Sequence, residues 1–407
     1  MKILVVTTEI GLTGGGLSLS CSRLVDQLSK DNVVEVTNSS EMPVNTALGD
    51  HFPNLGKSIQ LEYKLKTDVE KYKGYDVVIG FGAKLNGYYA SLLAKQINAR
   101  FILCLRGSDV NLAKWTVEDS WFLRNAASSA SRIVCLSNEM KQNLLLVERS
   151  VNNKIVIIPN QFEGEYSDIC FPNLPLSVVI GCAASHLNEK KGICNLLGMV
   201  AEFKIISNLP IKFVLVGDID DDLKFEYQHA INNLSLHSNV EFHDSTSRSN
   251  LASIMGKWDF YVQGSVCEGH PNSITEALQN RCAFISTNTG YVAEILQPKY
   301  PELFFDDWHP VSMAKSLKKL IDLDGKEKIY STAYKILKQH CNKQMIAAKW
   351  NELIAHKTST IEKKDIEHVV AVGLHDVQGN LHDSITTPIY VFQKFVECVH
   401  RSGYGLC

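Results

Sequence analysis

The sequence predicts an α/β protein built from two doubly wound domains, each with a parallel β-sheet. Three features carry this prediction: a length of 407 residues, short apolar runs that alternate with longer helical stretches, and a polar, aperiodic segment in mid-chain. Apolar runs that alternate with helices are typical of a parallel sheet covered by helices on both faces. We therefore expect two such domains facing each other across a cleft, where ligands of this architecture usually bind.

The first domain is expected over residues 1–165. Its strand-length apolar runs are Lys2 to Thr7, Val77 to Gly80, Phe101 to Leu105, Ile133 to Leu136 and Ile155 to Ile158. Pro159-Asn160 ends this pattern, and the polar stretch from Gln161 to Pro175 is typical of a linker between domains.

The second domain is expected over residues 166–345, where the same pattern starts again. Buried strands are predicted at Val178 to Ala183, Phe213 to Val216, Val240 to His243, Phe260 to Val262 and Ala283 to Ser286, with helices at Ile193 to Ile206, Leu223 to Leu234 and Ser273 to Gln279. Residues 346–360 are expected to form a helix that packs back on the first domain. Residues 361–407 change in composition and form an extra tail, too short for a domain of its own.

Composition and charge exclude several classes of protein. With 45% hydrophobic and 21% charged residues the chain is globular, and a net charge of -3 offers no basic field for nucleic acid. The eleven cysteines form no C-x-x-C pair or metal-type cluster, which favours reduced thiols in the cytoplasm. We find no secretory leader and no spanning apolar run, so only peripheral membrane contact stays open. The sequence does not indicate an oligomeric state.

The segment from Glu268 to Glu276 reads EGHPNSITE and follows a predicted strand. It places Glu268 in a loop and Glu276 inside the next helix, where each carboxylate can accept hydrogen bonds from vicinal hydroxyls. The helix start at Asn272 and Ser273 directs main-chain N–H groups toward a phosphate. A helix start that carries polar residues only for capping is the alternative.

The other candidate sites follow strands in the same way. Between a strand and the helix at Ile193 lies AASHLNEKKG, in which Lys191 beside Gly192 can contact phosphate oxygens. A glycine run that includes Gly15 and Gly16 follows the first strand, but Leu19 stands at the third glycine position of a dinucleotide fingerprint, whose acidic partner would be Glu35. A tight turn alone is the other interpretation of that run.

Two further patterns are weaker. Arg106-Gly107-Ser108-Asp109 follows a strand at the expected cleft edge, and a salt bridge within this loop competes with a functional role. Asp218-Ile219-Asp220 has the form of an Asp-x-Asp metal site, but an aspartate-rich turn after a strand needs no metal.

Taken with NRCAFIST at 280–287 and GYVAEI at 290–295, the Glu268 segment resembles the donor-site signature of family 4 glycosyltransferases of the GT-B fold. The resemblance implies two Rossmann-like domains. It also implies that Glu268 binds hydroxyls of the transferred sugar, that Glu276 binds the ribose, and that Asn272 and Ser273, with Gly269 and Pro271 in the same signature, line the diphosphate site.

The resemblance assigns the remaining sites as well. Lys191 matches a family lysine that faces the diphosphate, whereas His186 stands where the family has arginine, which puts one phosphate contact in doubt. Gly15 and Gly16 match the loop near the donor phosphates, and Arg106 and Asp109 match a region near the acceptor and the reacting sugar.

The implied activity is retaining transfer of a sugar from a nucleotide diphosphate donor, without metal or cofactor, to a glycan, lipid-linked or small-molecule acceptor in surface polysaccharide synthesis. A nucleotide-sugar epimerase, a phosphorylase and a catalytically weak binding protein are the alternatives. An NAD-dependent oxidoreductase is disfavoured by Leu19. The tail weakly resembles the start of a polysaccharide deacetylase.

Overall fold

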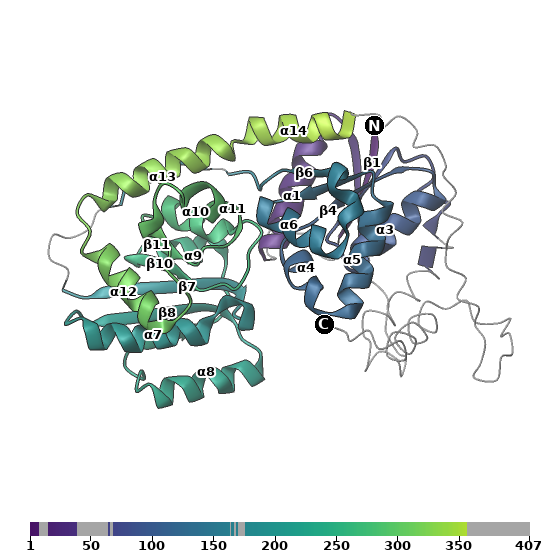
Figure 1. Ribbon diagram of the computed structural model, residues 1–407. Coiled ribbons are helices and arrows are strands. Elements are labelled where there is room, and N and C mark those ends of the chain that lie inside the picture. Colours follow the sequence, from purple (N-terminus) through teal and green to yellow (C-terminus); the bar gives the residue numbers. More distant parts are fainter. Residues whose placement is uncertain are drawn as a thin grey trace, which may run out of the picture.

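The computed structural model describes residues 1–7, 15–38, 64–65, 68–162, 164–166, 168–169 and 176–355. The predicted extra tail and most of the predicted linker lie outside these ranges. Figure 1 shows two lobes side by side, each a sheet covered by helices, joined near β6 and again by α14.

The first lobe holds a six-stranded parallel sheet in the order β2-β1-β3-β4-β5-β6. Its strands are β1 (Lys2–Thr7), β2 (Val33–Asn38), β3 (Val77–Phe81), β4 (Arg100–Cys104), β5 (Arg132–Cys135) and β6 (Ile155–Ile157). Its helices are α1 (Gly16–Leu28), α3 (Leu85–Gln96), α4 (Ser108–Asn111), α5 (Val117–Ser129) and α6 (Asn138–Val147). Strand order reverses between β1 and β3, the position at which sheets of this kind usually bind ligands.

The second lobe holds a five-stranded parallel sheet in the order β11-β10-β7-β8-β9. Its strands are β7 (Val178–His186), β8 (Ile211–Asp218), β9 (Val240–His243), β10 (Phe260–Gln263) and β11 (Ala283–Ser286). Its helices are α7 (Ile193–Ile206), α8 (Asp221–Asn233), α9 (Arg248–Met255), α10 (Asn272–Gln279), α11 (Gly290–Leu296), α12 (Pro310–Ile321) and α13 (Lys326–His340). Here the strand order reverses between β7 and β10.

The last described helix, α14 (Lys343–Ala355), crosses from the second lobe to the first (Figure 1). Its apolar side chains, among them Ile346, Trp350 and Leu353, pack in the same core cluster as Ile3 and Val5 of β1. The first lobe therefore closes over a segment that is distant in sequence. The prediction of two parallel-sheet domains of the GT-B type is confirmed.

The structure also corrects the predicted strands. Strand β2 was missed, because none of its described side chains is buried and Val33 is 64% exposed at the sheet edge. Strand β9 was expected to be buried, yet it forms the other sheet's edge and its side chains are mostly exposed. An edge strand has a neighbouring strand on only one side, and the described side chains of β2 and β9 are not buried, so a search for apolar runs buried on both faces misjudges them. None of the helices in the described ranges is long and apolar enough to cross a bilayer.

Candidate functional site

The loops after β7 and β10, the two strands at the switch point of the second sheet, meet in direct contact. Gly192 has φ 63°, and a Cβ there would lie 2.2 Å from the carbonyl oxygen of Gly264, so only glycine fits without a shift. The N–H of Val266 donates to the carbonyl of Lys190 at 2.9 Å. These contacts fix the Lys191 loop against the Glu268 loop.

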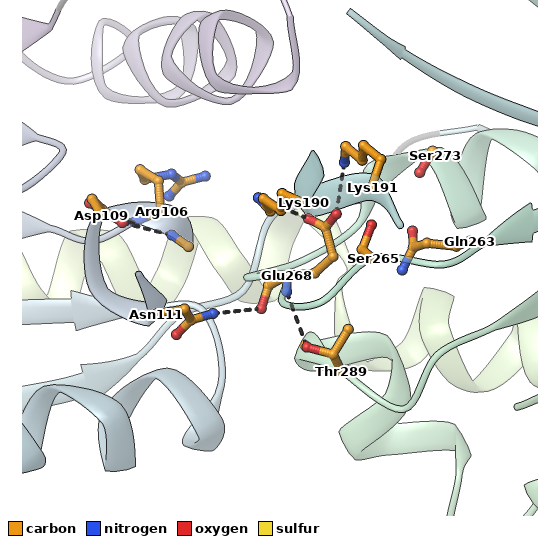
Figure 2. Close-up of polar contacts among 12 residues, drawn as sticks. Arg106, Asp109, Asn111, Lys190, Lys191, Gln263, Ser265, Glu268, Ser273 and Thr289 are labelled. Atoms are coloured by element: carbon orange, nitrogen blue, oxygen red, sulfur yellow. Dashed lines mark hydrogen bonds and ion pairs between the residues drawn. The ribbon is translucent and has the colours of Figure 1, made fainter. Parts of the chain in front are cut away.

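The carboxylate of Glu268 is the centre of this site (Figure 2). Its Oε1 lies 2.8 Å from Nζ of Lys191 and its Oε2 lies 3.8 Å from Nζ of Lys190, while the residue is only 8% exposed. Burial alone would raise the pKa of Glu268, but the charges of Lys191 and Lys190 outweigh it and hold the pKa below its usual value. Burial lowers the pKa of Lys191, and the Glu268 charge outweighs that and raises it. Both groups are therefore charged at neutral pH.

The main chain of Glu268 is held by residues of both lobes (Figure 2). Its N–H donates to Oγ1 of Thr289 at 3.1 Å, within the second lobe. Its carbonyl accepts a hydrogen bond from Nδ2 of Asn111, on α4 of the first lobe, at 3.3 Å. Gly290 packs against Glu268 so closely that a Cβ would lie 3.1 Å from the Glu268 carbonyl oxygen.

Helix α10 starts directly behind this loop. The N-cap residue is Pro271, whose side chain cannot accept a hydrogen bond, so it leaves the main-chain N–H groups of the first turn uncapped. The hydroxyl of Tyr261 donates to Oγ of Ser273 at 2.8 Å, which anchors the first turn to β10. One turn further on, Oε1 of Glu276 pairs with Nη1 of Arg248 on α9 at 2.9 Å. Three of the predicted donor residues, Asn272, Ser273 and Glu276, thus lie on one helix.

Glycines of each lobe lie close to residues of the other lobe. A Cβ on Gly15 would lie 2.8 Å from Oγ of Ser185, and one on Gly16 would lie 3.8 Å from Nδ2 of Asn272. A Cβ on Gly269 would lie 2.6 Å from the carbonyl oxygen of Arg106. Gly15, Gly16 and Gly269, all predicted site residues, therefore lie where the lobes touch. The remaining glycine of that run, Gly14, lies outside the described residues.

The structure does not support a substrate-facing Asp109. Its carboxylate accepts main-chain N–H groups from Arg106 at 2.9 and 3.1 Å, from Gly107 at 2.8 Å and from Ala83 at 3.0 Å. Burial raises its pKa, and these hydrogen bonds act in the opposite direction. Because main-chain N–H groups occupy both of its carboxylate oxygens, we reassign Asp109 from a catalytic residue to one that positions its own loop.

Arg106 extends toward the chain segment that joins the lobes. Its guanidinium lies 4.5 Å from the ring centre of Phe81, and Nη2 donates to Oδ1 of Asn160. In turn, Nδ2 of Asn160 donates to Oδ1 of Asn272 at 3.1 Å. In place of the alternative salt bridge between Arg106 and Asp109, the structure has this chain of hydrogen bonds to the start of α10.

His186 was placed in a loop, but it ends strand β7. The strand bulges between Ala183 and His186 and then pairs His186 with Asp218 of β8. A Cβ at position 217 would lie 2.2 Å from the carbonyl oxygen of Ala184. Gly217, at φ 149°, has no Cβ and therefore permits this bulge. The nearby His186 also contributes to lowering the pKa of Asp218, after hydrogen bonds from Ser245. His186 is exposed, so the phosphate contact expected there stays a prediction.

His270 was not singled out by the sequence. It is 7% exposed, stacks on Tyr291 with ring centres 5.5 Å apart, and its Nδ1 has no hydrogen-bond partner in the described part of the chain. Burial, with Arg106 and Arg23 nearby, lowers the pKa of His270 to about 3. The imidazole is therefore neutral in the folded protein.

Sequence reasoning also missed Lys190, Asn111 and Thr289. Lys190 is adjacent to Lys191 in the same motif, and this spacing is the signal that could have indicated a second positive charge near Glu268. Asn111 and Thr289 belong to no recognisable pattern, and only the tertiary structure brings them to the Glu268 main chain. Across the described ranges, no cluster of three or more His, Cys, Asp or Glu residues could hold a metal ion.

Comparison with known proteins agrees with this geometry. Residues 177–336 match the family described as glycosyl transferases group 1, which confirms the prediction of a glycosyltransferase for the lobe that holds Glu268. An uncharacterized glycosyltransferase of Methanocaldococcus jannaschii is 24% identical over 323 residues, which is 76% of this chain and 85% of that protein. The GPI3 subunit of phosphatidylinositol N-acetylglucosaminyltransferase of Saccharomyces cerevisiae is 22% identical over 176 residues, covering 42% of this chain and 38% of that subunit.

Solved structures share the two-lobed fold. HepE of Anabaena, in complex with UDP and glucose, has a TM-score of 0.68 at 17% identity over 87% of this chain and 99% of its own. Sucrose-phosphate synthase of Thermosynechococcus elongatus has a TM-score of 0.67 at 16% identity over 86% and 98%. The predicted resemblance of the tail to a deacetylase finds no support in these comparisons.

Proposed function

We propose that this protein transfers a sugar from a nucleotide diphosphate donor to an acceptor, with retention of the anomeric configuration. The observation that carries the proposal is the buried Glu268 carboxylate, held by Lys191 at the switch point of the second sheet and flanked by the start of α10. A carboxylate that can accept hydrogen bonds from hydroxyls thus lies beside groups that can contact a phosphate. The match of residues 177–336 to group 1 glycosyltransferases supports the same reaction.

The ion pair leaves each partner free to bind the donor. An ammonium group has three donors and a carboxylate about four acceptor positions, so the contact of 2.8 Å uses one of each, and Lys190 lies 3.8 Å from the other oxygen. We propose that Glu268 accepts hydrogen bonds from the transferred sugar while Lys191 and the first turn of α10 contact the diphosphate. Glu276 would accept the ribose hydroxyls with the carboxylate oxygen that Arg248 does not use.

In the proposed step the bond from the anomeric carbon to the diphosphate oxygen breaks, and a bond to the acceptor oxygen forms on the same face. The departing phosphate oxygen takes the acceptor proton, so no protein nucleophile is required. Lys191 and the N–H groups of α10 would stabilise the charge on the leaving group. Because these groups supply the positive charge, we propose that no bound metal is needed, and a chelator should leave the rate unchanged.

We propose that the acceptor binds on the first lobe, which faces Glu268 through Asn111. A glycan or lipid-linked acceptor in surface polysaccharide synthesis fits this arrangement, with the protein in the cytoplasm or peripherally attached to the membrane. A relative named for transfer of N-acetylglucosamine to phosphatidylinositol supports a lipid-linked class, although the match covers 38% of that subunit.

A panel of nucleotide sugars tests the proposal, beginning with UDP sugars. A donor at 100 times its dissociation constant should stabilise the protein by about 2.7 kcal/mol in a thermal-shift assay. With that donor, Glu276→Gln should weaken binding, and Lys191→Met should lower transfer about 10²- to 10³-fold. The control is Asp322→Asn, at the exposed end of α12. Isomerised donor with no acceptor present would indicate an epimerase, and binding without transfer to any acceptor would contradict the proposed activity.

A further inference from the structure

Helix α6 of the first lobe and helix α11 of the second lobe lie against each other, and a glutamate on each helix accepts hydrogen bonds from the start of the other. Oε2 of Glu294, on α11, accepts the main-chain N–H of Asn138 at the start of α6 at 2.7 Å, and Oε1 accepts from the Asn138 side chain. In the opposite direction, Oε2 of Glu139, on α6, accepts the main-chain N–H of Gly290 at the start of α11 at 2.7 Å. Each helix start is thus bound by a glutamate of the other lobe.

These contacts between the lobes extend to Glu268 through Thr289. The hydroxyl of Thr289 donates to Glu139, at 3.2 Å from Oε2, and accepts the N–H of Glu268 at 3.1 Å. Thr289 is 6% exposed, so water has little access to its hydroxyl. A hydroxyl donates one hydrogen bond, and that of Thr289 goes to Glu139. The lone pairs of the Thr289 oxygen are therefore available to accept the N–H of Glu268.

A second path runs from the same helix to the other side of Glu268. Nδ2 of Asn143, on α6, donates to Oδ1 of Asn111 at 3.0 Å, and Nδ2 of Asn111 donates to the Glu268 carbonyl at 3.3 Å. Both main-chain groups of Glu268 are therefore held, through one intervening side chain each, by α6 of the first lobe.

We propose that Glu139 and Glu294 form a latch between the lobes, and that Glu139 is a positioning residue for the transfer reaction. The latch holds the lobes closed and fixes the main chain of Glu268, so the carboxylate reaches its working position only when the first lobe is in place. The role assigned to Glu268 rests on the proposed function. The latch itself rests only on contacts between α6 and α11.

The chemistry of these contacts gives the expected size of the effect. Hydrogen bonds to an ionised carboxylate are about twice as strong as neutral ones, and removing one partner leaves main-chain N–H groups without an acceptor. Of the donor contacts proposed above, only that of Glu268 depends on the latch, whereas those of Glu276, Lys191 and the first turn of α10 do not. Loss of the latch should therefore lower kcat about 10- to 100-fold while changing the donor dissociation constant less than threefold.

The test compares Glu139→Ala, Glu294→Ala and the double variant with Glu226→Ala, which removes an exposed glutamate of α8. Small-angle X-ray scattering of the full chain should show a larger radius of gyration for the latch variants than for the wild type. The control variant should have the wild-type radius of gyration. Glu139→Gln, which keeps an acceptor oxygen, should recover part of kcat. Thermal unfolding checks that each variant is folded.

The two readouts separate the latch from the proposed function. An unchanged radius of gyration in the double variant would overturn the latch, whether or not any donor turns over. An expanded double variant that keeps the wild-type kcat would overturn the positioning role of Glu139. If the wild-type protein transfers no sugar while the double variant expands, the latch stands and the proposed function fails.

Discussion

The buried His270 should make the stability of the protein fall between neutral and mildly acidic pH. Its folded pKa is about 3, whereas an imidazole in the unfolded chain titrates near 6.5. Because the folded pKa is the lower one, the stabilising contribution is complete above pH 6.5 and is lost as the pH falls toward 3. From pH 7.5 to pH 5.0 the free energy of unfolding should drop by about 2 kcal/mol through this residue alone, at 1.36 kcal/mol per pH unit below 6.5.

Urea unfolding of the wild type and of His270→Phe at these two pH values measures the effect. Phenylalanine keeps the stack on Tyr291 and removes the titrating group, so the variant should lose about 2 kcal/mol less than the wild type. His237→Gln, at an exposed site on the same lobe, should behave as the wild type does. Equal losses in His270→Phe and the wild type would refute the reasoning.

Two further predictions concern the same site. Glu268→Gln and Lys191→Met should each lower the free energy of unfolding by about 3 kcal/mol, and the double variant by about 2 kcal/mol less than the sum, because removing one partner leaves a buried charge. Strictly additive effects in urea unfolding would contradict this. As the control, breaking the exposed Lys318–Asp322 pair should lower the free energy of unfolding by less than about 0.5 kcal/mol. Gly269→Ala should lower transfer about tenfold or more, because its Cβ would lie 2.6 Å from a carbonyl oxygen of the first lobe.

The glycine prediction has a control of its own. Gly256, at the end of α9, has a helical conformation and room for a methyl group at 3.4 Å from its nearest neighbour. Gly256→Ala should therefore leave the transfer rate and the scattering profile unchanged. A wild-type rate in Gly269→Ala would show that the lobes approach less closely there.

The sequence was informative where function depends on local pattern. Apolar runs located the strands of both sheets with the exception of β2. The segment from Glu268 to Glu276 indicated a loop followed by a helix, as the structure has it. Lys191 could be linked to the same site because Lys191 and Glu268 each follow a strand of the second domain. Such features depend on residues close in sequence, where spacing alone determines which face or loop they occupy.

The sequence was misleading where a side chain has two possible directions. Asp109 follows a strand at the cleft, and nothing in its neighbours shows that its carboxylate turns back onto the N–H groups of Arg106 and Gly107. His186 was assigned to a loop because the bulge that prolongs β7 depends on Gly217 in the next strand. Both outcomes depend on contacts that periodicity does not encode.

The sequence by itself determined two parallel-sheet domains and the approximate place of Glu268, because burial patterns and strand-end motifs are local. Only the tertiary structure decided how Glu268 is held. Asn111 and Glu139 lie more than a hundred residues earlier in the chain and on the other lobe, yet both connect to its main chain. Such contacts form only when two independently folded cores close on each other, so a single sequence read locally carries no trace of them.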